Sequence, residues 1–149
     1  MGVHPYWYEQ PFESTTEATL KRLQQRVFDA GEFNPVIAIP KFPFPNGEAN
    51  SHGFRTIEEV VEESAEEGTR SILDIECFSG HQAAGCTSII SAEMCEFLFG
   101  TMEPDAALVR DRLPVSEAWN ELDRGECLHL IAKNRAGPKI VFFWGLSFD

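Results

Sequence analysis

Eleven residues in the middle of the chain, from Glu76 to Cys86, hold several side chains whose types could do chemistry. This stretch, ECFSGHQAAGC, contains two thiols and one imidazole. One interpretation is a zinc site formed by Cys77, His81, Cys86 and Cys95. Three, four and eight residues separate these side chains, whereas structural zinc sites usually contain close Cys-x-x-Cys pairs. The spacing argues against zinc, and we expect no metal and no cofactor.

A thiol active site is the second interpretation of the same stretch. A nucleophilic cysteine needs a base nearby, and a helix N-terminus often lowers its pKa. Cys86 is the best-placed thiol because it follows a Gly/Ala loop and precedes a predicted helix. His81 and His129 are candidate bases, and Asp74 is a candidate orienting group. No catalytic motif joins these four residues, so we favour a glycine-hinged loop with structural sulfurs.

His129 and Asp74 also have simpler interpretations. A lone histidine in an apolar strand such as LHLI more often forms a hydrogen bond in the core than binds a ligand. Asp74 and Glu76 are expected on one face of a strand, two residues apart. They could act as an acid/base pair or hold a metal, but a solvated sheet face or an ion pair with Arg70 agrees better with ordinary burial.

The chain contains four cysteines, and nothing in it marks secretion. Reduced thiols are therefore the expectation. No apolar run approaches the roughly 20 residues of a membrane helix, and the N-terminus lacks the basic start and apolar stretch of a secretory signal. We expect a cytoplasmic protein with no membrane partner.

The elements that must position these residues follow from apolar periodicity, caps and glycine stops. Ser14 and Glu17 have the spacing of a capping box, and Gly31 is a natural helix end. The full prediction comprises a strand at 5–12, helices at 15–30 and 56–68, a strand at 70–78, helices at 91–100, within 101–113 and at 116–125, and a C-terminal β-hairpin of strands 127–132 and 139–146.

Helices do not alternate strictly with strands in this order. We therefore expect a single α+β domain over residues 1–149, with a small, mostly antiparallel sheet of about four strands covered by helices. The strand at 139–146 is apolar on both faces, which predicts a central position or cover on both sides.

A proline-rich segment at 33–54 interrupts the regular elements, with prolines at 35, 40, 43 and 45. No helix survives that spacing. Phe42 and Phe44 either form a recognition element or pack beneath the loop, and the sequence leaves both alternatives open.

The net charge of −12 is concentrated in the middle of the chain, where residues 48–102 hold eleven acidic and two basic residues. Such a field repels nucleic acid and attracts basic partners. The helix at 56–68 carries a polar face made only of glutamates, with no lysine for i,i+4 pairing. These candidate partner-binding residues are Glu58, Glu59, Glu62, Glu63, Glu66 and Glu67.

Three segments carry a resemblance to known sequences: LeuXXLeu…PheXAlaGlyXPheAsnProVal over residues 20–36, GlyThrArgSerIleLeuAspIle over residues 68–75, and a terminal SerPheAsp. The pattern resembles small bacterial proteins described only as hypothetical. The resemblance implies a bacterial source and carries no activity.

The sequence favours a non-catalytic interaction module whose acidic face meets a basic protein, for example an immunity or inhibitor protein against a basic toxin. Phe42 and Phe44 would add apolar contacts. The alternative is a small enzyme or ligand-binding domain with a pocket near Asp74, His81, Cys86 and His129.

Overall fold

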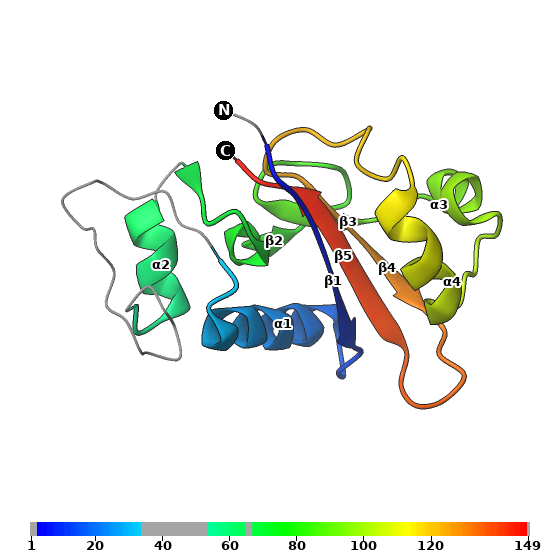
Figure 1. Cartoon of the computed structure of the whole chain (residues 1–149), viewed down its shortest axis with the longest axis horizontal. Helices are drawn as coiled ribbons and strands as arrows, with labels where there is room; N and C mark the ends of the chain where they lie inside the picture. The colour runs from blue at the N-terminus through cyan, green and yellow to red at the C-terminus, as the bar shows by residue number, and fades with distance from the viewer. Residues whose placement is uncertain (1–2, 34–53, 65–66, 149) are drawn as a thin grey trace.

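The computed structural model describes residues 3–33, 54–64 and 67–148. Within these residues, five strands form one sheet in the order β1-β5-β4-β3-β2 (Figure 1). The strands are β1 (Pro5–Pro11), β2 (Cys77–Phe78), β3 (Cys86–Ile89), β4 (Cys127–Ala132) and β5 (Ile140–Leu146). β5 pairs antiparallel with β1 and β4, whereas β3 pairs parallel with β4 and β2.

The α+β class and the C-terminal hairpin are confirmed. The sheet has five strands rather than about four, and it is mixed, because the longer antiparallel pairs are joined by short parallel pairs at β3. The chain leaves β3, passes through α3 (Ala92–Phe99) and α4 (Ala106–Arg112), and returns in β4. A long crossover of this kind lets consecutive strands run parallel. The long connection between β3 and β4 therefore allows these two strands to pair in parallel.

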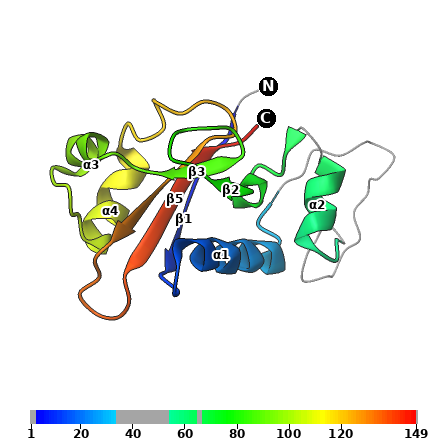
Figure 2. The ribbon, with the colours of Figure 1, turned by 180° about the vertical axis from the view of Figure 1, so that it is seen from behind.

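Helices cover both faces of the sheet (Figures 1 and 2). α1 (Thr16–Ala30) and α2 (Ile57–Ser64) contribute to one buried cluster, and α3 and α4 contribute to the other. Phe143 of β5 belongs to the first cluster, while Phe142 and Trp144 belong to the second. The prediction that this strand is covered on both sides is confirmed, because alternate side chains supply opposite cores.

α1 begins and ends much as the sequence predicts, with one shift. The N-cap is Thr15, whose hydroxyl accepts a hydrogen bond from the Ala18 N–H at 3.0 Å, rather than Ser14. The helix ends at Gly31, which has a positive φ of 69° and donates its N–H to Phe28. Glycine suits this position because it has no Cβ to clash in the left-handed region.

The strand expected at 70–78 is wrong for most of its length. Ile72–Asp74 forms a 3₁₀ turn, and the strand β2 begins only at Cys77. The Ser71 hydroxyl accepts from the Leu73 N–H at 3.2 Å, and the Asp74 carboxylate accepts from the Thr69 N–H at 2.7 Å. Such local bonds between side chains and backbone compete with a sheet ladder.

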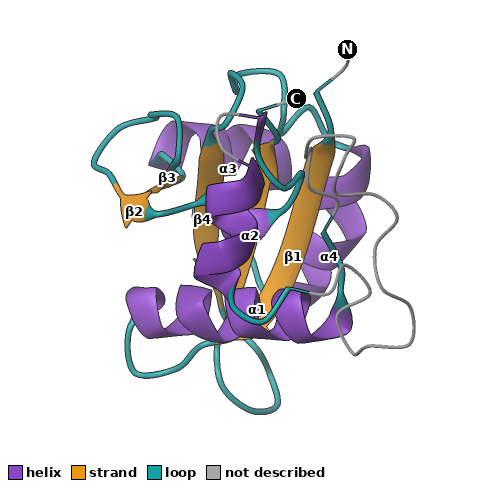
Figure 3. Cartoon of the chain, turned by 90° about the vertical axis from the view of Figure 1, so that its left-hand side faces the viewer, coloured by secondary structure: helices purple, strands orange, loops and turns teal. Residues whose placement is uncertain are grey.

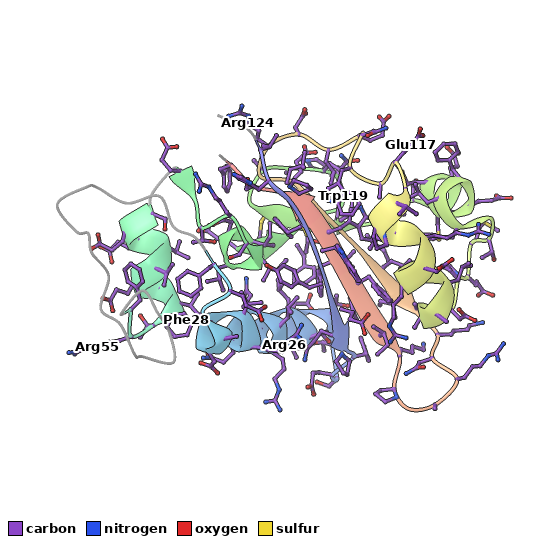
Figure 4. All side chains as sticks on the ribbon, viewed as in Figure 1. Arg26, Phe28, Arg55, Glu117, Trp119 and Arg124 are labelled. Atoms are coloured by element: carbon purple, nitrogen blue, oxygen red, sulfur yellow. A yellow bond between two sulfur atoms is a disulfide. The ribbon has the colours of Figure 1, made fainter. Side chains whose placement is uncertain are left out.

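The helix expected at 116–125 is also wrong, because this segment forms turns. The indole of Trp144 donates to the Ala118 carbonyl at 3.2 Å, and the indole of Trp119 donates to the Gly145 carbonyl at 3.0 Å. These bonds dock the segment on the end of β5, beside the Trp119 label in Figure 4. Tertiary hydrogen bonds thus replace the intrahelical bonds that the periodicity predicts.

Phe42, Phe44 and the rest of 34–53 lie outside the described residues, as does Glu66. Figure 3 shows α2 in front of the sheet and above α1. No helix in the described part of the chain has both the length and the apolar character of a membrane span.

Candidate functional site

Cys77 and Cys86 form a disulfide, with their Cα atoms 4.6 Å apart. The two residues are direct partners in the parallel pairing of β2 with β3. The expectation of reduced thiols is therefore wrong for this pair, because the strand register brings them together and sequence spacing does not reveal it. A disulfide sulfur has no proton to lose, so Cys86 offers no thiolate nucleophile. Cys95 and Cys127 are free and buried.

His129 is a core residue. Its exposed fraction is 6 %, its Nδ1 lies 2.9 Å from the Thr87 hydroxyl, and its ring packs between Phe78 and Phe143. Burial lowers the pKa of His129 to about 4, so the imidazole is neutral at pH 7. This placement agrees with the simpler interpretation of a hydrogen-bonded core histidine.

The four candidate residues of the enzyme interpretation do not converge on one cavity. Asp74 lines a pocket with Gly85, but Cys86, His81 and His129 are not among its lining residues. His81 is exposed in the loop between β2 and β3. Within the described ranges, no group of three or more His, Cys, Asp or Glu side chains is arranged to hold a metal.

The described glutamates of α2, and Glu67 beyond it, are largely exposed. Glu58, Glu59, Glu62 and Glu67 face solvent, while Glu63 is half-buried. Glu59 also has a structural role, because its carboxylate accepts from the Arg55 N–H at 3.3 Å at the start of the helix. The described residues of α2 include no exposed large apolar side chain. This helix thus offers charge without an apolar anchor.

A second acidic surface does carry such an anchor. Phe97 of α3 is 71 % exposed. It lines a shallow pocket of about 370 Å³ together with three glutamates, and no basic residue is among the lining residues described. We call this the Phe97 surface, and its residues are Ser91, Glu93, Met94, Phe97, Glu117, Asn120 and Glu121.

The Phe97 surface is formed by α3 and by the turns at 117–121, and both segments pack on the buried core. On α3, the Ser91 hydroxyl caps the helix by accepting from the Met94 N–H at 3.1 Å, and Leu98 is buried in the core. On the opposite half, Ala118 is buried on the same side of the sheet. Figure 4 shows Glu117 directed away from the sheet, next to α3. A rigid scaffold of this kind suits a binding surface.

One sequence signal for this surface exists. Cys95, Leu98 and Phe99 are buried at the i, i+3, i+4 spacing of a core-facing stripe. Phe97 falls outside this stripe, and an aromatic ring in that position must be exposed or covered by another element. The proximity of Glu117 and Glu121 carries no local signal, because it depends on how the 116–122 turns dock.

Comparisons with protein families, with curated proteins and with solved structures found no match. The resemblance to small bacterial proteins stays a prediction, and the chemistry of the surface must carry the argument on function.

Proposed function

We propose that this protein is a non-catalytic binding module that engages a basic protein partner through the Phe97 surface. The observation that carries the proposal is a 71 % exposed phenylalanine within a pocket that also contains Glu93, Glu117 and Glu121. Contiguous exposed apolar surface rimmed by polar residues marks interaction sites, and Phe97 with Met94 forms the apolar part of this pocket. An inhibitor of a basic enzyme is the concrete version that the chain length and the net charge of −12 support.

The chemistry of the pocket favours an arginine or lysine side chain as the anchor of the partner. A guanidinium or ammonium group is attracted to the face of an aromatic ring. Carboxylates around the ring would accept its N–H donors in charge-assisted hydrogen bonds. The apolar stem of the same side chain would contact Phe97 and the half-buried Met94.

The test compares two charge-matched variants. The first neutralises the Phe97 surface through Glu93→Gln, Glu117→Gln and Glu121→Gln. The second neutralises the exposed glutamates of 58–67 through Glu58→Gln, Glu62→Gln and Glu67→Gln. Each removes three negative charges. The probe is a fluorescent peptide with two arginines flanking a leucine, measured by fluorescence anisotropy.

We expect the first variant to weaken peptide binding at least about tenfold, the loss of one to a few charge-assisted contacts. The second variant should weaken it less than about threefold. Phe97→Ala, which keeps every charge, should also weaken it by about tenfold. Equal losses in both triple variants, or an unchanged affinity for Phe97→Ala, would indicate unspecific attraction and overturn the proposal.

A further inference from the structure

A second pocket, of about 390 Å³, lies away from the Phe97 surface and shares none of its lining residues. Val61 of α2 and Phe148 give it apolar walls, and Gly68 and Gly85 contribute backbone without side chains. Asp74 and Glu76 supply two carboxylates. The volume falls within the range of small-molecule sites, which are mostly apolar with a few placed polar groups.

Asp74 is the unusual member of this lining. Its exposed fraction is 9 %. One carboxylate oxygen, Oδ1, accepts from the Thr69 N–H at 2.7 Å, but Oδ2 has no hydrogen-bond partner in the described part of the chain. A buried charged oxygen without a partner is costly, and native proteins rarely retain one without a reason.

The space beside Oδ2 depends on a glycine. A Cβ added at Gly68 would lie 2.8 Å from Asp74 Oδ2 and 3.1 Å from the Phe148 ring. The backbone of the same loop has a positive φ at two positions, +76° at Gly68 and +56° at Arg70. A non-glycine residue with positive φ is uncommon. A side chain at position 68 would therefore clash with the Asp74 carboxylate.

No described ion pair neutralises Asp74. Asp74 itself contributes to the raised pKa values of the nearby Tyr6 and Tyr8 phenols, which are acids rather than cations. Burial raises the pKa of Asp74, and its effect exceeds the opposing effect of hydrogen bonds from Thr69 and from the backbone of Arg70 and Ser71. A cation delivered from outside would satisfy Oδ2, and the exposed Glu76 at the same pocket would attract it.

We infer that this pocket binds an organic cation with a short apolar stem, an alkylguanidinium or alkylammonium group whose head is received by Asp74 Oδ2. The stem would contact Val61 and Phe148. Because Oδ2 is almost inaccessible, the ring of Phe148, which packs against Gly68 and Gly125, must rotate as the ligand enters. The same chemistry occurs in free amines and in the side chains of arginine and lysine.

The experiment is an NMR titration of the ¹⁵N-labelled protein with n-butylguanidinium, and n-butanol serves as the neutral control with the same stem. We expect saturable shifts of the Gly68, Thr69, Gly85 and Phe148 amides with the cation and none with butanol. N-acetyl-arginine amide forms a second arm. Tighter binding of this compound than of n-butylguanidinium would identify a peptide side chain as the source, and weaker binding would identify a free small cation.

Two variants make the result specific. Asp74→Asn should lower the affinity for n-butylguanidinium at least about tenfold, and Glu76→Gln, at an exposed position, should lower it by a few fold. Asp111→Asn on the exposed side of α4, which lines neither pocket, should leave the affinity unchanged. Reading the affinity from the Gly68, Thr69, Gly85 and Phe148 amides separates this site from the proposed partner surface. Equal binding by Asp74→Asn, equal shifts with butanol, or no shifts at all would overturn the inference.

Discussion

Burial raises the pKa of several acidic side chains on the α1 side of the sheet. Burial raises the pKa of Tyr8 to about 12 and also raises the pKa of Tyr6 well above its usual value. For Asp74, burial opposes the hydrogen bonds from the backbone of the 69–71 loop, and burial has the larger effect on its pKa. The folded protein therefore holds the Asp74 proton more tightly than the unfolded chain does.

The pH dependence of stability follows from this raised pKa. The protonated Asp74 side chain makes its full contribution to the free energy of unfolding below the pKa of Asp74 in the unfolded chain. That contribution is lost as the pH rises through the pKa of Asp74 in the folded protein. The Asp74→Asn side chain cannot ionise. The free energy of unfolding of this variant should therefore rise relative to that of the native protein as the pH increases from 3 to 7. Urea unfolding of both proteins across this range measures the difference.

Asp111→Asn on the exposed side of α4 is the matched control, because it removes one carboxylate outside the buried core. The pH-dependent gain in unfolding free energy should be larger for Asp74→Asn than for this control. A difference for Asp74→Asn that shrinks as the pH rises would contradict the raised pKa.

At the scale of single elements, the pairing of β2 with β3 depends on one covalent bond, the disulfide between Cys77 and Cys86. β2 has two residues, too short a strand to be secured by its ladder bonds alone. The Cys77–Cys86 disulfide closes the loop between the two strands. This loop supplies Gly85 to the Asp74 pocket, so the bond also positions one wall of that pocket.

Removing the disulfide tests its structural role. The double variant Cys77→Ser, Cys86→Ser should lose about 2–3 kcal/mol in unfolding free energy, the chain-entropy value for a loop of this length. Native protein in a reductant should lose the same amount, while the double variant should not respond to reductant. Chemical denaturation measures both.

Thiol counting provides the independent control. Denatured, unreduced protein should react with a thiol reagent at Cys95 and Cys127 alone, and at all four cysteines after reduction. Four reactive thiols without reduction would show that the pair does not form.

At the scale of the whole molecule, the two acidic regions lie at opposite ends. α2 stands at one end of the long axis and α3 at the other (Figures 1 and 2). The net charge of −12 produces a field that attracts a basic partner toward either end. Long-range attraction depends on total charge, whereas the lifetime of a complex depends on close contacts.

Binding kinetics should separate these two contributions. The triple variants of 58–67 and of the Phe97 surface carry the same net charge, so both should slow association with a basic partner peptide to a similar, salt-dependent extent. Only the Phe97-surface variant should accelerate dissociation, by about tenfold. Stopped-flow measurements at low and moderate salt provide both rates. Faster dissociation in the 58–67 variant would place the contact surface on α2 instead.

The sequence by itself determined those features that short segments encode. Local periodicity and caps predict three such features. They are the apolar face of α1 with its end at Gly31, the start of α2 at Thr56, and the apolar faces of the C-terminal hairpin. Their physics lies within a few residues, so the α+β class was predictable. The acidic surfaces were predictable as composition, because charges rarely become buried.

Only the tertiary structure decided the features that join distant segments. The disulfide forms because the register of β2 on β3 pairs Cys77 with Cys86. The turns at 116–122 are held by hydrogen bonds from the indoles of Trp119 and Trp144. Asp74 is buried beside Phe148 in a loop that the Thr69 N–H closes. Each depends on contacts across the fold that no local pattern encodes. Both proposed sites are of this kind, because a binding pocket exists only where separate elements meet.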